Sequence, residues 1–223
     1  MAFGLMLPLL ADDRLSQSLS STQTTRFNVA AAGAIHFENS FGEIDIQGWD
    51  RPEVEVTTTR STEHTYGPRQ RAAEQQRLDR VQVSTRQDGN DLVISTVYPA
   101  RSFYLHPLSR RSDIEIHYDV HAPRASKLII DHNSGGMYIS GMDGAVRATV
   151  INGQITLLLA PGRYAIDAQC GLGNVYSDFA GQDRSRHLIG RKFSSEAAAP
   201  AVNLYLRTRV GDILLLQPSG PAD

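Results

Sequence analysis

The chain has 223 residues and a net charge of −2, with 41% hydrophobic and 21% charged residues. This composition excludes an intrinsically disordered chain, and the length allows a domain with a sizeable core. The overall charge favours neither nucleic acid nor an anionic membrane as a partner.

The chain begins with an apolar run, "MAFGLMLPLLADD", followed by a polar stretch rich in Ser, Thr and Gln over residues 12–25. The run has the length of the hydrophobic region of a secretory signal and is too short to cross a bilayer. It lacks the basic start of such a signal. We therefore expect residues 1–26 to be an N-terminally truncated signal followed by a flexible leader, with an apolar first strand or a disordered end as the alternative.

Residues 27–217 alternate apolar and polar side chains, as in Ile44/Ile46, Ile114/Ile116 and Ile155/Leu157. This period of two predicts half-buried strands, and Gly, Asn, Asp and Pro mark the turns between them. Residues 68–80 differ, because a proline is followed by good helix formers. They predict a short capping helix or a charged surface loop. Residues 95–113 read as a long loop, and residues 218–223 as a C-terminal tail.

A similar phrase recurs at five glycines that each precede an apolar alternation: Gly42, Gly136, Gly153, Gly173 and Gly211. Most of their separations are close to multiples of about 19 residues, a period typical of stacked β architectures. Glycine suits a corner that needs positive φ or a close backbone approach. The repeat predicts an all-β, single-stranded β-solenoid or β-helix-like stack. A two-sheet β-sandwich, whose turns also recur, is the alternative.

Two stretches carry a family resemblance. "FENSFGEIDIQGWDRPEVEVTTTRS" and "SDIEIHYDVHAPRASKLIIDHNSGGMYISGMDGAVRATVINGQITL" resemble the bacterial putative-adhesin family of β-strand-repeat proteins. The resemblance covers roughly residues 27–217. It implies a β-helical or β-roll domain, exported or membrane-tethered, without established catalytic residues. A second transmembrane helix and a lipobox cysteine, which would anchor such a protein, are not found in this sequence.

The sequence contains no GxSxG, HExxH, Walker A or GxGxxG motif, so we expect no catalytic, cofactor-binding or metal residues. The lone Cys170 reads as a small buried residue. His117 and His121 share one face of a strand about 13 Å apart, which is too far for one metal ion. Trp49, the only tryptophan, is expected to pack near the end of the stack and only secondarily to hold a ligand.

Charged side chains leave further alternatives open. Glu43 and Asp45, like Glu53 and Glu55, are expected on a solvated face, although clustered carboxylates would suit a polysaccharide lyase or hydrolase. The basic run at 184–192, "RSRHLIGRK", suits an anionic glycan or a solvated loop.

The sequence as a whole predicts a non-enzymatic exported protein of the periplasm or cell surface, with an adhesin-like binding or scaffolding role. We expect a glycan or an envelope protein as partner, no nucleic acid, and no transmembrane helix in the mature chain. The expected contact surface contains Phe103, Tyr104 and His106. The alternatives are a carbohydrate-active enzyme on the same scaffold and a scaffold that self-associates through its end strands.

Overall fold

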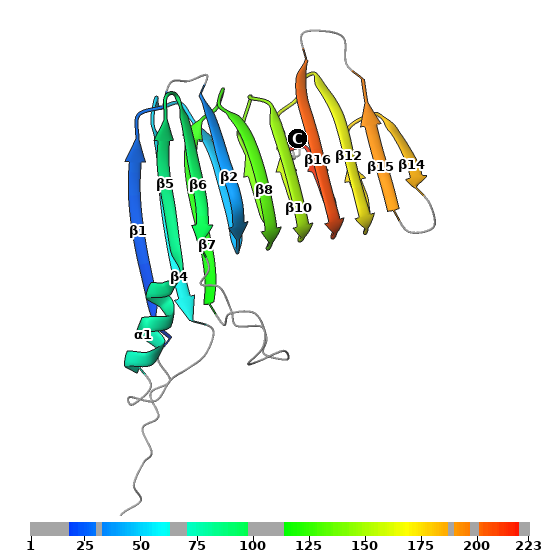
Figure 1. Ribbon diagram of the computed structural model, residues 1–223. Coiled ribbons are helices and arrows are strands. Elements are labelled where there is room, and N and C mark those ends of the chain that lie inside the picture. Colours follow the sequence, from blue (N-terminus) through cyan, green and yellow to red (C-terminus); the bar gives the residue numbers. More distant parts are fainter. Residues whose placement is uncertain are drawn as a thin grey trace, which may run out of the picture.

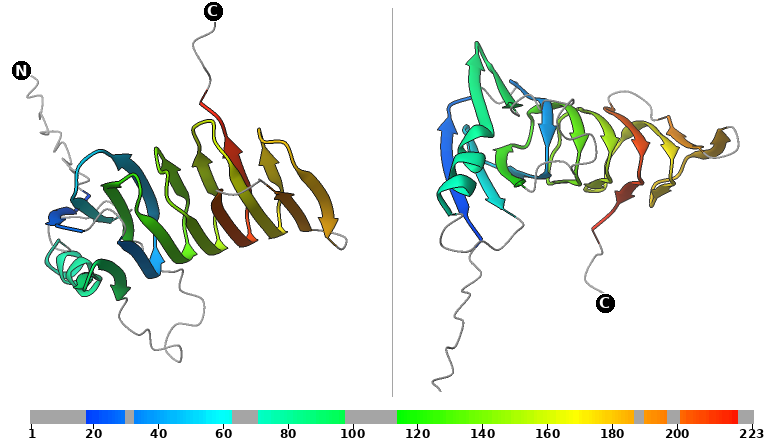
Figure 2. Two further views of the ribbon diagram at one scale, coloured as in Figure 1. Left: turned by 90° about the horizontal axis from the view of Figure 1, so that it is seen from above. Right: turned by 60° about the horizontal axis from the view of Figure 1, so that its bottom comes forward.

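The computed structural model describes residues 18–29, 33–62, 71–97, 114–186, 190–196 and 201–218. These residues form two mixed β-sheets and one short helix, so the prediction of an all-β protein is confirmed. The two sheets lie face to face as layers (Figure 2). Their inward side chains form a single apolar core between them.

The eight-stranded sheet contains, in spatial order, β1 (Ser20–Phe27), β4 (Val54–Thr62), β7 (Ile114–Pro123), β3 (Glu43–Trp49), β9 (Met137–Ser140), β11 (Ile155–Leu158), β17 (Ile213–Leu216) and β13 (Val175–Ser177). From β7 to β13 all neighbours run parallel, whereas β4 is antiparallel to both β7 and β1. β1 begins inside the polar stretch expected to be a leader, because its threonines suit an edge strand.

The nine-stranded sheet contains β14 (Gln182–Arg186), β15 (Gly190–Ser195), β12 (Tyr164–Leu172), β16 (Val202–Val210), β10 (Val146–Asn152), β8 (Lys127–Ser134), β2 (Ala34–Phe41), β6 (Asp91–Val97) and β5 (Gln82–Asp88). The strands from β12 to β6 run parallel, and antiparallel strands close both ends (Figure 1).

A row of glycines connects the two sheets. Five strand pairs, β2–β3, β8–β9, β10–β11, β16–β17 and β12–β13, each cross from one sheet to the other at a glycine with positive φ. In spatial order these glycines are Gly42, Gly135, Gly153, Gly211 and Gly173. A Cβ on any of the last four would collide with the carbonyl oxygen of the preceding glycine in the row. Backbone hydrogen bonds such as Gly211 N–H to Leu172 O continue the ladder through the corner.

The structure does not support the predicted single-stranded β-solenoid, because the strand pairs do not stack in chain order. β16, which comes late in the chain, lies between β10 and β12 (Figure 1), and β17 likewise lies between β11 and β13. The two layers are also open and end in antiparallel strands, which favours the sandwich-like alternative. The corner at the second repeat is Gly135, with φ of 128°, and not the predicted Gly136. A repeated corner predicts stacking but does not specify which copies are neighbours.

A β-bulge interrupts β2 where it meets β8. The register shifts between Phe37 and Ser40, and Asn39 adopts a φ of 51°. The Ser40 hydroxyl lies 2.8 Å from His132 Nδ1, and both side chains are buried. His132 Nε2 has no hydrogen-bond partner among the residues that the structure describes, and burial lowers the pKa of this imidazole to about 4.

The expected short helix is confirmed as α1 (Arg71–Arg80). Glu74 in its first turn and basic residues in its last turn complement the helix dipole. Leu78 is its buried residue and anchors the helix near β1 and β4 at one end of the molecule (Figure 1).

Candidate functional site

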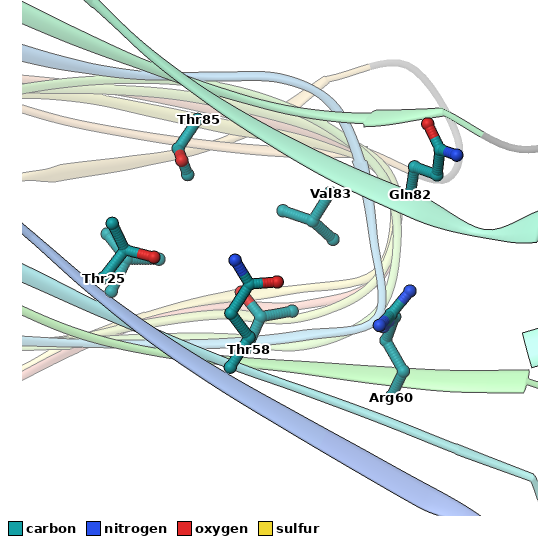
Figure 3. A pocket seen from close by; sticks show the side chains of 8 residues that line it. Thr25, Thr58, Arg60, Gln82, Val83 and Thr85 are labelled. Carbon is teal, nitrogen blue, oxygen red and sulfur yellow. The ribbon is translucent and has the colours of Figure 1, made fainter. Parts of the chain in front are cut away.

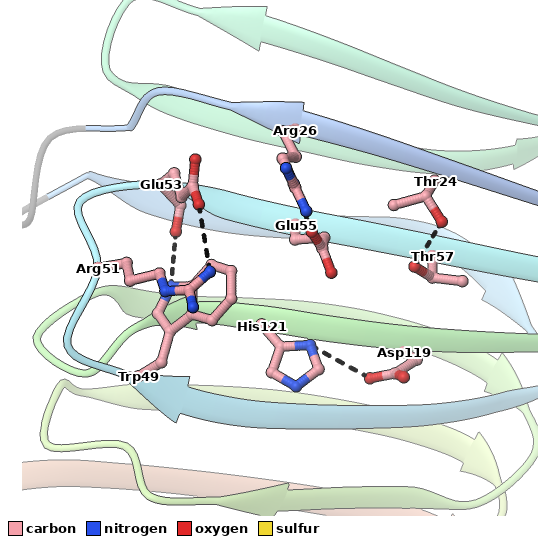
Figure 4. Close-up of polar contacts among 9 residues, drawn as sticks. All are labelled: Thr24, Arg26, Trp49, Arg51, Glu53, Glu55, Thr57, Asp119 and His121. Atoms are coloured by element: carbon pink, nitrogen blue, oxygen red, sulfur yellow. Dashed lines mark hydrogen bonds and ion pairs between the residues drawn. The ribbon is translucent and has the colours of Figure 1, made fainter.

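The outer face of the eight-stranded sheet carries rows of polar side chains across β1, β4, β7 and β3 (Figure 4). The hydroxyls of Thr24 and Thr57 lie 2.9 Å apart, and Arg26 Nε lies 2.5 Å from a Glu55 carboxylate oxygen. Such pairs form because side chains at one register point to the same face of neighbouring strands. They present hydroxyl, guanidinium and carboxylate groups on a broad surface.

The row that contains Thr24 and Thr57 continues into two carboxylates. Asp119 on β7 is the register partner of Thr57 on one side and of Asp45 on the other. Burial, and then the adjacent Asp119 charge, raise the pKa of Asp45, whereas His117 and His121 act to lower it. Glu43 and Asp45 lie on the outer face, as predicted, but Glu43 is exposed whereas Asp45 is half-buried and lies beside a second acid.

Trp49 borders this row at the end of β3. Its indole Nε1–H donates to Glu53 O at 2.8 Å, and the Arg51 guanidinium carbon lies 4.9 Å from the ring centroid. The His121 ring lies 5.2 Å from the indole, and its Nδ1 lies 3.6 Å from an Asp119 oxygen. Trp49 therefore packs against its neighbours, but on the outer face of β3 within the sheet and not near the end of the stack as predicted. These contacts also fix His121 beside the acidic pair. We call Trp49, His121, Asp119, Asp45 and Glu55 the acidic–aromatic surface.

A pocket of about 200 Å³ lies on the opposite, inner side of β1 and β4, between the two sheets (Figure 3). Its lining is mostly polar and consists of Gln23, Thr25, Val56, Thr58, Arg60, Gln82, Val83 and Thr85. Along β4 the inward residues change from Val54 and Val56 to Thr58 and Arg60. Arg60 donates to Val81 O at 2.6 Å, so its guanidinium ties the two layers together. The space between the sheets is therefore lined mostly by polar side chains at the end of the molecule that contains β1, β4 and β5.

The other predicted residues have the following positions. Phe103, Tyr104 and His106 lie outside the described residues, so the expected contact surface stays a prediction. Cys170 is free and buried, as expected, its thiol donates to Gly173 O at 2.9 Å, and burial raises its pKa. Among the described residues, no group of three or more His, Cys, Asp or Glu side chains is placed to hold a metal ion. The basic run at 184–192 contributes to β14 and β15.

The searches by sequence give no relative: no family model and no curated protein matches the chain. A solved structure of a putative cell adhesion protein from Clostridium sporogenes is similar, with a TM-score of 0.50 and 10% identity over 90% of this chain and 100% of that one. A putative adhesin from Bacteroides fragilis matches with a TM-score of 0.27 and 14% identity, over 88% and 97% of the two chains. At these identities the first match supports the fold alone.

None of the helices that the structure describes is long and apolar enough to cross a membrane.

Proposed function

We propose that this protein is a non-enzymatic, exported envelope protein of the putative-adhesin type, which holds a glycan or an envelope protein on the acidic–aromatic surface. The observation that carries the proposal is the row Thr24, Thr57, Asp119 and Asp45 beside the fixed His121 ring. A protein described as a putative cell adhesion protein shares this fold, and the role is proposed by analogy with that description.

The chemistry of the surface suits a polyhydroxylated ligand. Carboxylates accept hydrogen bonds from sugar hydroxyls, while threonine hydroxyls both donate and accept. Strands in the sheet lie about 4.8 Å apart, so successive side chains of one row meet successive groups of an extended chain. Many weak contacts along a row give affinity without a deep pocket.

Trp49 provides a direct test because it is the only tryptophan and contacts His121. We expect soluble peptidoglycan fragments, or another glycan of a defined panel, to change its fluorescence on titration. Asp119→Asn leaves the reporter in place and is expected to weaken binding about tenfold, the usual cost of a charged hydrogen bond. Asp131→Asn, an exposed acid on β8 of the other sheet, is the matched control. Equal affinities for the two variants, or no ligand in the panel or in an envelope extract, would refute the proposal.

One observation favours a second candidate, a carbohydrate-active enzyme. Asp45 and Asp119 are neighbours, and the raised pKa of Asp45 suits a proton donor. Such an enzyme would release reducing ends from the bound glycan, and Asp45→Asn would abolish the release while the glycan still binds. Binding without any release of reducing ends supports the adhesin-like role.

A further inference from the structure

A second surface of different chemistry lies at the other end of the molecule, on the nine-stranded sheet. Its outward positions on β10, β16, β12, β15 and β14 carry five described cationic side chains and one carboxylate. The cations are Arg147, Arg184, Lys192, Arg207 and Arg209, and the acid is Asp167. We call these six residues the basic patch. Its excess of four positive charges contrasts with the chain's net charge of −2.

Contacts within the basic patch hold its cations close together. Asp167 accepts from Arg207 Nη2 at 2.6 Å and lies 3.3 Å from Lys192 Nζ. The Arg207 and Arg147 guanidinium carbons lie 3.9 and 4.8 Å from the centroid of the Tyr205 ring. Asp167 is thus ion-paired with both cations, although its Oδ1 makes no hydrogen bond among the described residues. Within the described part of the chain, Arg147 and Arg209 make no ion pair, so their donors are free for an external anion.

Exposed aliphatic side chains border the basic patch at the corner of the sheets. Ile151, Leu172 and Val210 are 44%, 46% and 39% exposed, and a contiguous group of exposed apolar side chains often marks an interaction site. Val210 is the register partner of Leu172 on one side and of Asn152 on the other. The three residues, which we call the aliphatic ridge, therefore lie at the corner ends of three neighbouring strands, β10, β16 and β12, all of which also carry patch residues.

We propose that the basic patch and the aliphatic ridge together dock the protein onto the surface of a membrane that contains anionic lipids. Arg147, Arg207 and Arg209 would contact lipid phosphates, and Ile151, Leu172 and Val210 would enter the headgroup region. Peripheral membrane proteins bind by this combination of cations and apolar side chains.

The ridge is what favours a lipid surface over a soluble polyanion. A dissolved acidic polymer would neutralise the cations but would leave the aliphatic side chains in water. A single-stranded nucleic acid needs open aromatic faces for base stacking, whereas arginines stack on the Tyr205 ring.

Asp212, on the far side of the glycine corner, accepts the Asn174 N–H at 2.7 Å. It precedes β17 of the eight-stranded sheet and so lies outside the patch strands.

Co-sedimentation with vesicles tests the proposal. We expect the full chain to bind vesicles of phosphatidylglycerol and phosphatidylcholine in equal parts, and not vesicles of phosphatidylcholine alone. The double variant Arg147→Gln/Arg209→Gln is expected to bind at least tenfold more weakly, since each cation near an anionic surface contributes roughly fivefold in affinity. Leu172→Ser/Val210→Ser is expected to lose binding as well. Arg86→Gln, at an exposed outward position of β5, is the control and keeps binding.

A spectroscopic variant separates insertion from adsorption. In a Trp49→Phe background, Leu172→Trp places the only tryptophan on the aliphatic ridge, and its emission is expected to shift to the blue on vesicle binding. Dextran sulfate serves as a soluble polyanion probe. Two results together would show that the partner is a soluble polyanion and that the lipid proposal is wrong. The parent chain would bind dextran sulfate as tightly as it binds the vesicles, and the Leu172/Val210 double variant would bind each of them as tightly as the parent chain does. Failure of the parent chain to bind anionic vesicles also overturns it.

Discussion

Gly135 lies in the row of corner glycines, where a side chain has no room. A Cβ at this position would collide with the Gly42 carbonyl, and the φ of 128° is strained for any residue with a side chain. We expect Gly135→Ala to lower the free energy of unfolding by about 3 kcal/mol or more. Gly89→Ala is the control, because Gly89 has a φ of 61° but open space around its Cα, and should cost only about 1 kcal/mol. Urea denaturation measures both, and equal losses would contradict the role of the close approach.

His132 is expected to make stability depend on pH. Its folded pKa of about 4 lies below the usual 6.5, so between these values the unfolded chain binds a proton that the folded chain excludes. The free energy of unfolding therefore keeps its full value above pH 6.5. It decreases as the pH falls toward 4, by up to about 3 kcal/mol from this histidine. Unfolding free energies of the parent chain and of His132→Gln should therefore differ in slope across this window. Parallel pH profiles would show that the imidazole is not kept neutral by burial.

Single positions were predictable where the local pattern decides them. Ile44 and Ile46 face the core and Glu43 faces outward, as the alternation indicates. The corner glycine of the second repeat was predicted one residue too late, because "SGG" offers two glycines and only the backbone conformation distinguishes Gly135 from Gly136. The partner of His132 was not predictable, since a β-bulge brings Ser40 to it.

At the scale of elements, the β16–β17 pair is expected to be essential for folding. It separates β10–β11 from β12–β13, so a chain that ends after residue 200 leaves two internal edges unpaired in each sheet. We expect this truncation to abolish the cooperative urea transition, whereas a chain that ends after Pro218 keeps it. A cooperative transition in the shorter chain would mean that β12 pairs directly with β10.

The types of element were predictable, but their order was not. Periodicity indicated the strands, and the helix formers after Pro68 indicated α1. All five corners offer the same kind of glycine and the same aliphatic rows, so no local signal distinguishes the neighbour of β10. Which strand pairs with β10 depends on contacts between strands that are remote in sequence.

At the scale of the molecule, the acidic–aromatic surface and the basic patch lie on opposite sheets and toward opposite ends of the strand order. Docking through one should therefore leave the other accessible. We expect acrylamide to quench Trp49 fluorescence equally well in the free protein and in the protein bound to anionic vesicles. Protection of Trp49 by vesicles would show that the acidic–aromatic surface, and not the patch, faces the lipid.

The composition of the candidate site depends on the whole fold. The sequence indicated that Asp45 is exposed, but Asp119 becomes its neighbour only because β7 returns to pair with β3. The basic patch joins residues of five strands in the same way. The net charge of −2 averages over such segregated surfaces, which is why it favoured no charged partner.

The position of β16 also implies a competition during folding. β12 is synthesised before β16 and has the same alternation of buried and outward side chains, so it is the first strand available to the open edge of β10. The native order requires β16 to occupy that edge instead. Pairing of β12 with β10 would therefore form a kinetic trap that resembles the native sheet, and escape from it would require strand exchange. Slow refolding would then reflect the correction of strand order, and not the formation of any single strand.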